Sequence, residues 1–257
     1  MSAVSWLVRL YPASLRDRWG DCLTDEVSVG GWRRLPNLLL GALDMWVHPV
    51  VWPADSAAQR RRRAAVLAFV VGLGGWLIGH LTVEESGLPA SLTHSWTLNL
   101  CDLLVLLGLL LVVPLPRLSI AGLARFTGEV VRKLAVPVLI GGAVLARANL
   151  ATPMSTGTRT VLLVSWWVAL VLGAIQVCGV VGGLGPDLTR PPHPVRLRLG
   201  IGALAASYAI SGAVVLWSTL SSGAAGVLAA LVGGTLFVLT VLCGWTLHDL
   251  RAVALSD

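Results

Sequence analysis

The pattern of apolar and polar positions divides the chain near residue 60. From there to the C-terminus, long apolar segments alternate with short polar ones. Each apolar segment is close to the ~20 residues that a helix needs to cross the hydrocarbon core of a bilayer. We therefore predict an all-α fold, a polytopic bundle of six transmembrane helices, of which Pro137 and Arg147 interrupt the third. The predicted spans lie at about residues 64–83, 95–113, 130–150, 160–184, 197–220 and 224–247.

The segment 1–59 has a different pattern and predicts a short helical prefix on the cytoplasmic side. A helix over residues 38–48 contains Asp44 and is too short to span a bilayer, so we expect it to lie at the interface. Before it, apolar side chains recur at helical spacing along a charged helix. This apolar stripe packs on the membrane body or the headgroups, or it docks a partner protein. The stripe consists of Leu15, Trp19, Leu23 and Val27.

Composition excludes an ordinary soluble domain. Of the 257 residues, 56% are hydrophobic and only 12% are charged, and the mean hydropathy is +0.80. Soluble domains carry about 25% charged residues. A soluble globule of this length could not bury so much apolar surface, so an integral membrane protein is expected. The four cysteines have no metal or redox spacing, and we interpret them as free thiols.

Charge predicts how the chain threads the membrane. The run Arg60, Arg61, Arg62 and Arg63 directly precedes the first predicted span and acts as a topological anchor. With the N-terminus inside, 17 of the 19 basic residues face the cytoplasm, and only Arg147 and Arg159 face outward. We therefore predict cytoplasmic N- and C-termini in a bacterial inner (cell) membrane. Because the basic residues lie between apolar spans, the net charge of +6 does not indicate nucleic-acid binding.

Ionisable residues inside predicted spans are candidate functional residues, because burying a charge in a membrane is costly. Four polar side chains fall at one predicted depth below the outer surface. We expect a cluster in which Asp102 pairs with Arg147 or His80. Such a cluster would serve as a structural lock or as a ligand or proton site; the alternative is that it does not form. The four residues are His80, Asn99, Asp102 and Arg147.

The sequence contains no feature that argues for catalysis. It has no nucleophile elbow, no zinc-protease motif and no Gly-rich phosphate loop. His80, Glu84 and His94 follow no metal-binding motif. We therefore predict no enzymatic activity, no catalytic residue, no cofactor and no metal.

Small residues recur at four-residue spacing in several predicted spans, as at Gly75 with Gly79. In the sixth span, Ala230 lies between Gly226 and Gly234 at the same spacing. This spacing lets helices approach closely. Intramolecular packing is the expected use, and a homo-oligomer interface is the alternative.

The prefix resembles the start of certain bacterial membrane proteins. These include large ABC-type permeases of the macrolide-exporter kind and uncharacterised multi-span proteins, which share a prefix R-L-Y-P-x-x-[FWL]-R-x-R-[YW]-G-[DE]-E. Cys22 stands where that pattern has its second acidic residue. The stretch Gly41–Pro49 is similar to a G-A-L-D-x-x-x-x-P stretch of the uncharacterised proteins. The resemblance covers about the first fifty residues. Its first part reads Arg9-Leu10-Tyr11-Pro12-Ala13-Ser14-Leu15-Arg16-Asp17-Arg18-Trp19-Gly20-Asp21.

Three functions follow as hypotheses. The first is a non-catalytic membrane subunit of a transport or export system; since no Walker motif occurs, an ATP-driven role implies a separate ATPase or other partner. The second is a signalling or regulatory membrane protein whose prefix binds a cytoplasmic partner. The third is a membrane-embedded enzyme acting on lipid at the Asp102 cluster. A lipid-sized cavity beside Asp102 would favour the third.

Overall fold

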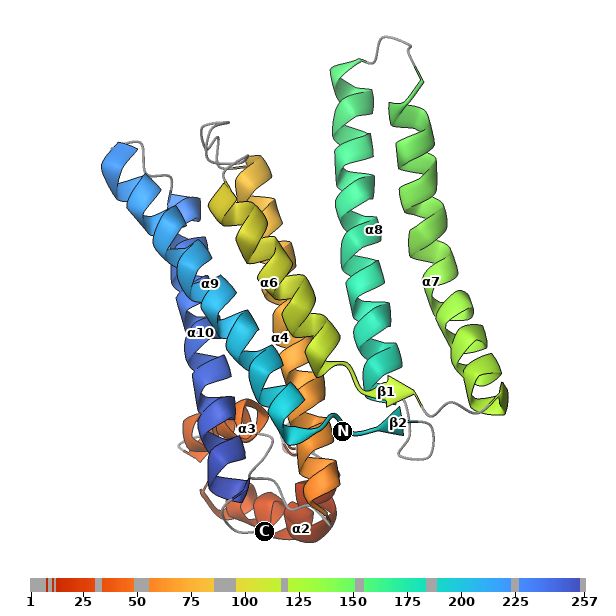
Figure 1. Cartoon of the computed structure of the whole chain (residues 1–257). Coiled ribbons are helices and arrows are strands. Elements are labelled where there is room, and N and C mark those ends of the chain that lie inside the picture. The colour runs from red at the N-terminus through yellow and green to blue at the C-terminus, as the bar shows by residue number, and fades with distance from the viewer. Residues whose placement is uncertain are drawn as a thin grey trace.

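The computed structural model describes residues 8, 11, 13–30, 34–48, 56–85, 96–116, 120–150, 155–183, 189–222 and 227–254. Within these ranges the protein is helical, apart from connections and one pair of two-residue strands. Figure 1 shows the longest helices standing side by side, with two shorter helices across one end of them. The all-helical fold is thus as predicted from the apolar pattern.

The two shorter helices form the prefix: α2 (Ala13–Gly30) and α3 (Leu35–Val47). They pack on each other through a small apolar core of Tyr11, Leu38 and Ala42, against which Leu15 and Leu23 also pack. The Tyr11 hydroxyl donates a hydrogen bond of 2.8 Å to the Leu38 carbonyl oxygen. The prefix is therefore a folded helical hairpin.

The rest of the chain contains six longer helices, and each predicted span falls on one of them. They begin and end within four residues of the predicted limits, except that α4 begins seven and α7 ten residues earlier and α10 ends seven residues later. The helices are α4 (Ala57–Glu85), α6 (Trp96–Val112), α7 (Ile120–Ala148), α8 (Thr156–Gly183), α9 (Pro194–Ser222) and α10 (Val227–Ala254).

Four of these helices are long and apolar enough to cross a membrane: α4, α8, α9 and α10. The predicted count of six is not reached, for two different reasons. Helix α6 is apolar but has 17 residues, which span ~26 Å against a hydrocarbon core of ~30 Å. Helix α7 has 29 residues, but Glu129, Arg132 and Lys133 lie in its middle. Only residues 134–146 of α7 remain as an uncharged apolar stretch.

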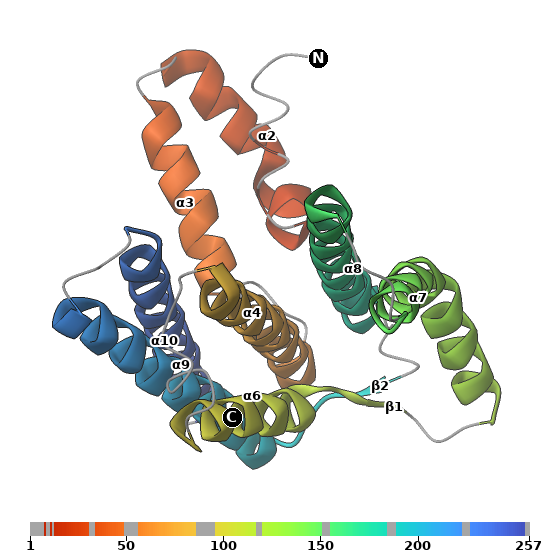
Figure 2. The same ribbon diagram turned by 90° about the horizontal axis from the view of Figure 1, so that it is seen from above.

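Helices α4, α6, α9 and α10 form a packed body, and α7 and α8 form a separate hairpin beside α4 (Figures 1 and 2). The centre of the body is α9, whose Leu197, Ile201 and Leu204 are fully buried. Glycine allows its neighbours to approach closely. A Cβ atom added at Gly200 would lie 3.0 Å from the Gly108 carbonyl oxygen of α6, and one at Gly212 would lie 3.2 Å from the Gly233 carbonyl oxygen of α10.

At the end of the body near the prefix, two arginines of α9 form hydrogen bonds to neighbouring helices. Arg196 of α9 donates to the carbonyl oxygens of Leu110 and Val113 at the C-terminal end of α6, at 2.5 and 3.2 Å. Arg198 donates to the Leu250 carbonyl oxygen in the last turns of α10, at 3.2 Å. The last four carbonyl groups of a helix have no partner within it, so Arg196 satisfies free carbonyl groups at the end of α6, whereas Arg198 adds a contact between α9 and α10.

The α7–α8 hairpin joins the body through a narrow base. Strand β1 (Leu115–Pro116) follows α6, and strand β2 (Thr189–Arg190) precedes α9. The strands pair antiparallel, with Leu115 opposite Arg190 and Pro116 opposite Thr189. The chain therefore leaves the body and returns to it at the same place.

Candidate functional site

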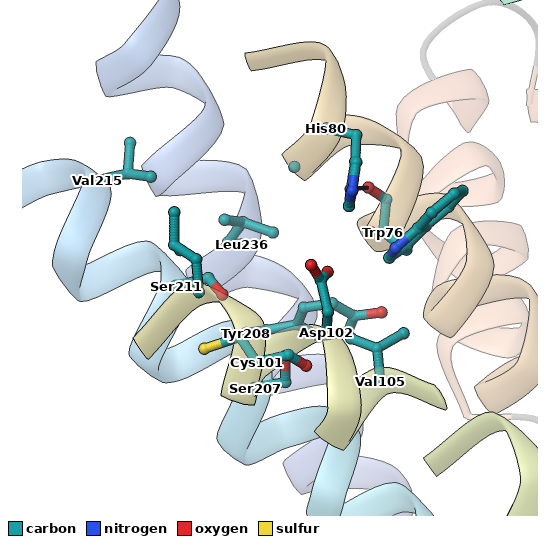
Figure 3. A pocket seen from close by; sticks show the side chains of 13 residues that line it. Trp76, His80, Cys101, Asp102, Val105, Ser207, Tyr208, Ser211, Val215 and Leu236 are labelled. Atoms are coloured by element: carbon teal, nitrogen blue, oxygen red, sulfur yellow. Dashed lines mark hydrogen bonds between the residues drawn. The ribbon is translucent and has the colours of Figure 1, made fainter. Parts of the chain in front are cut away.

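The candidate site is a small cavity inside the packed body. Its volume is about 100 Å³, and its walls come from α4, α6, α9 and α10. Figure 3 shows the Asp102 carboxyl group pointing into the space between α4 and α9. The polar side chains that line the cavity are His80, Asp102, Ser207, Tyr208 and Ser211.

One wall is held rigidly by hydrogen bonds from α9. The Tyr208 hydroxyl crosses to α4 and donates to the carbonyl oxygens of Val71 and Gly72, at 3.1 and 2.6 Å. It can cross because position 75 is glycine: a Cβ atom there would lie 2.6 Å from the Tyr208 ring. The Ser207 hydroxyl donates to the Cys101 carbonyl oxygen at 2.9 Å. These two side chains therefore join α9 to α4 and α6 around the cavity.

His80 faces the cavity from the other side, with its tautomer set by its own helix. Its Nδ1 lies 3.2 Å from the Trp76 carbonyl oxygen, and its ring centroid lies 4.4 Å from that of Trp76 (Figure 3). A carbonyl oxygen only accepts hydrogen bonds, so Nδ1 carries the proton of the neutral ring. The Nε2 atom is then the basic nitrogen available for a proton or a water molecule.

Asp102 is accessible to ligands in the cavity. Among the residues that the structure describes, no hydrogen bond or ion pair joins Asp102 to His80 or to any other side chain. A buried water needs ~10–15 Å³ of such space and two or more polar partners. The cavity has room and polar side chains for several waters beside the Asp102 carboxyl group and the His80 ring.

The structure brings together two of the four residues of the predicted cluster. Asp102 and His80 line the same cavity. Asn99 is exposed on α6, and Arg147 lies near the end of α7, which packs on α8; neither lines the cavity. The sequence analysis missed Ser207, Tyr208 and Ser211. A Ser-x-x-x-Ser pair one helical turn apart on an apolar span was the signal for two of them.

The cavity favours small occupants. Sites for drug-sized ligands have volumes of about 300–1,000 Å³, several times larger than this one. A carboxylate and an imidazole nitrogen in such a volume can hold a proton, a hydronium ion or a small hydrated cation. The lipid-sized cavity beside Asp102 that would favour a lipid-acting enzyme is not seen within the described residues. A possible metal site at His80, Glu84 and His94 falls partly on side chains outside the described ones.

The apolar stripe of the prefix is divided between two environments. Leu15 and Leu23 pack inside the prefix hairpin, whereas Trp19 is 55% exposed. The Val27 side chain lies outside the described part of the chain. Trp19 is therefore the member of the stripe that remains accessible to another molecule.

The prefix is fastened to the body at His48. Its Nδ1 lies 2.8 Å from Oδ2 of Asp249 on α10, its Nε2 lies 3.7 Å from Oδ1 of Asp44, and its ring centroid lies 5.5 Å from that of Trp245. The topological anchor Arg60–Arg63 lies in the first two turns of α4, at the same end of the body. The His48 contact joins residues 201 positions apart, so no local pattern in the sequence could indicate it.

Comparison of this chain with protein-family models, with curated proteins and with solved structures finds no match. The function is therefore inferred from the geometry of the chain's own residues.

Proposed function

We propose that this chain is a six-span protein of a bacterial inner membrane and the non-catalytic membrane subunit of a transport or export system. One observation carries the proposal. The Asp102 carboxyl group, without a protein partner among the described residues, lies in a cavity large enough for water inside an apolar helix bundle. Ionisable side chains in such positions are costly and mark ion paths and proton relays.

Asp102 and His80 supply the two halves of a proton site. The carboxylate can accept a proton, and His80, whose Nδ1 contacts the Trp76 carbonyl oxygen, supplies a second base at the wall of the same cavity. Protonation of either group changes the charge beside Tyr208, whose hydrogen bonds join α9 to α4. A change of protonation is thereby linked to the packing of the bundle.

The six-span arrangement accommodates the two helices that fall short by length or composition. Helix α6 is short by ~4 Å, an amount that local thinning of the bilayer or its flanking residues can absorb. In α7, Arg132 and Lys133 lie near the middle of the helix, and their long side chains extend toward the arginine-rich side of the protein, where such side chains reach the interface. The distribution of 17 of 19 basic residues supports cytoplasmic termini.

The prefix is the proposed contact for the partner. Its resemblance to the prefix of bacterial permeases supports this role, as does the exposed Trp19 on α2. Because His48 ties the prefix to α10, and α10 packs along α9, a partner bound at the prefix is connected to the helix that frames the cavity.

A pull-down from the native host tests the proposal. The chain carries a C-terminal tag, is extracted in mild detergent, and its co-purifying proteins are identified by mass spectrometry. We expect a separate ATPase or another membrane protein in near-stoichiometric amount. Trp19→Ala should reduce its recovery severalfold. Thr24→Ala on the same helix, whose hydroxyl bonds only to the Gly20 carbonyl oxygen, should not. Recovery of no partner would count against the transport-subunit role.

A signalling or regulatory membrane protein is the second candidate. The exposure of Trp19 favours it equally, because a cytoplasmic protein could bind the prefix directly. Under this alternative the pull-down recovers a soluble regulator, and Asp102→Asn leaves its recovery and its activity unchanged.

A further inference from the structure

A second, larger cavity lies between the body and the hairpin. Its volume is about 520 Å³, and its walls come from α4, α7 and α8. Representative wall residues are Phe69 and Leu73 of α4, Pro137 and Gly141 of α7, and Trp166 and Gly173 of α8. We call this cavity the hairpin groove.

The hairpin groove is suited to hydrocarbon and not to water. Its wall residues are all apolar side chains or glycines, with only the two indole N–H groups of Trp76 and Trp166 among them. Water in such a space would lack the two to four polar partners that it needs. Along α7 the groove extends from Leu134 to Leu145, a rise of ~16 Å at ~1.5 Å per residue. This length suits a single acyl chain.

Positive charge lies at one end of the groove. Lys133 precedes the wall residue Leu134 and lies one turn before Pro137 on the same face of α7. Its side chain is 29% exposed, compared with 77% for that of its neighbour Arg132. The Nζ atom of Lys133 lies 3.3 Å from Oε2 of Glu129, one turn farther from the groove. Lys133 is thus the more buried of the two basic residues and is adjacent in sequence to the groove wall, whereas Arg132 is largely exposed.

A second basic residue lies toward the same end on α4. Arg62 precedes the wall residue Phe69 by seven positions, two helical turns, and so lies on the same face of the helix. Helices α4 and α7 run in the same direction: the colours of Figure 1 show that each begins toward the end of the molecule where the prefix lies and finishes at the opposite end. Arg62 and Lys133 thus lie toward the N-terminal ends of both walls, on the side of the proposed cytoplasmic leaflet.

We propose that the hairpin groove binds one anionic phospholipid of the inner leaflet. The acyl chain lies along the groove, and the phosphate-containing headgroup contacts Lys133 and Arg62. Basic residues between transmembrane helices on the cytoplasmic side are suited to anionic headgroups. The lipid fills the space between hairpin and body and so stabilises their contact. This inference requires that the chain spans a membrane, but it is independent of any transport role.

Thermal unfolding of the purified full chain in neutral detergent tests the proposal. Phosphatidylglycerol is added to one sample and phosphatidylcholine to another. We expect phosphatidylglycerol to raise the unfolding temperature by several degrees more than phosphatidylcholine does, and native mass spectrometry to show one bound lipid. The double variant Lys133→Gln and Arg62→Gln should lose this difference. The control Arg132→Gln should keep it, since that side chain is 77% exposed and is not part of the groove wall.

Filling the groove tests the acyl-chain part separately. Gly142 lines the groove, and a Cβ atom added there meets no atom within 4 Å, so Gly142→Leu adds bulk at the groove wall without a clash at Cβ. We expect a tenfold loss of lipid binding. Gly179→Leu on α8, which is equally free of clashes but outside the groove wall, should bind lipid normally. Ala174→Leu, from the α8 wall, is a second filling variant should Gly142→Leu fail to fold.

Two results would overturn the proposal. If phosphatidylglycerol stabilised the double variant as much as it stabilises Arg132→Gln, the proposed headgroup contact would be wrong. If a folded groove-filling variant bound lipid as well as the unchanged protein does, the proposed acyl-chain contact would be wrong. A pull-down that recovers no transport partner would contradict the proposed function but would leave both lipid-binding tests unchanged.

Discussion

The four-helix body and the α7–α8 hairpin both contain long apolar helices, but they use their apolar surface differently. In α9, 39% of the most apolar stretch is buried inside the protein, compared with 6% in α8. In the body, the backbones of α6 and α9 approach closely at Gly108 and Gly200. In the hairpin, many apolar side chains, such as those of Val138 and Leu139, are exposed. Apolar content alone therefore does not show which helices pack on protein and which face lipid.

The difference predicts where the protein is sensitive to substitution. In lipid there is no hydrophobic drive between helices, so close packing and hydrogen bonds hold the body together. The hairpin has fewer such contacts with the body and depends more on its surroundings. Four substitutions test this contrast, from the largest expected effect on stability to the smallest.

Gly200→Leu should give the largest effect. An added Cβ would lie 2.8 Å from Cγ2 of Val112 and 3.0 Å from the Gly108 carbonyl oxygen, and the backbone atom cannot move aside. Overpacking of this kind costs about 3 kcal/mol or more. The measurement is the thermal unfolding temperature in detergent, with Gly179→Leu in the hairpin as the control. If both variants lowered the unfolding temperature equally, the proposed difference in packing between the body and the hairpin would be wrong.

Tyr208→Phe should have an intermediate effect. It removes a buried hydroxyl that donates to the carbonyl oxygens of Val71 and Gly72, and the expected loss is about 1 kcal/mol. Thr160→Val is the matched control, since it removes an exposed hydroxyl that bonds within α8. Unfolding midpoints should differ between the two variants by several degrees. A larger effect of Thr160→Val would contradict the rigidity assigned to the cavity wall.

His48→Gln should have a smaller and local effect. It removes the contact with Asp249 and the stacking on Trp245, worth about 1 kcal/mol for a partly exposed pair. Hydrogen exchange in α2 and α3 should then become about fivefold faster, while α9 stays protected. His248→Gln is the control, because that side chain is 83% exposed and 3.8 Å from Asp249. Unchanged exchange in the prefix would show that other contacts hold it.

Asp102→Asn should have the smallest effect on stability, within about 0.5 kcal/mol, since the carboxyl group has no protein partner among the described residues. Transport activity, in contrast, should be lost. Asn99→Ala, one turn away and exposed, should leave both quantities unchanged. A large drop in folded yield of Asp102→Asn would instead assign the residue to a structural lock.

The sequence predicted where the helices lie along the chain better than it predicted which helices pack together. Helix α6, for example, covers Trp96–Val112 where the apolar pattern predicted 95–113, because a span is determined by its own residues. Which helices pack together depends on contacts between distant segments. The spacing of small residues pointed to Gly234 in the sixth span, but a Cβ atom there meets nothing within 4 Å. Its neighbour Gly233 is the residue that approaches α9.

The candidate site shows the same limit. Predicted depth grouped Asp102 with His80, and both line the same cavity because α4 and α6 are neighbours in sequence and in space. Depth also suggested Arg147, which lies on α7, whereas the helix that packs along α6 is α9. No local pattern indicates that the chain leaves the body after α6 and returns to it at α9.

The pairing of β1 with β2 gives the molecule a modular construction. Because Pro116 lies opposite Thr189, the two points at which residues 117–188 join the rest of the chain are neighbouring strand residues. Paired strand residues are only ~5 Å apart, so a short turn could connect them directly. The hairpin is thus an insertion in a four-helix unit that already contains Asp102, His80 and the arginine contacts at its base. Such an insertion can change in length or sequence without disturbing the cavity.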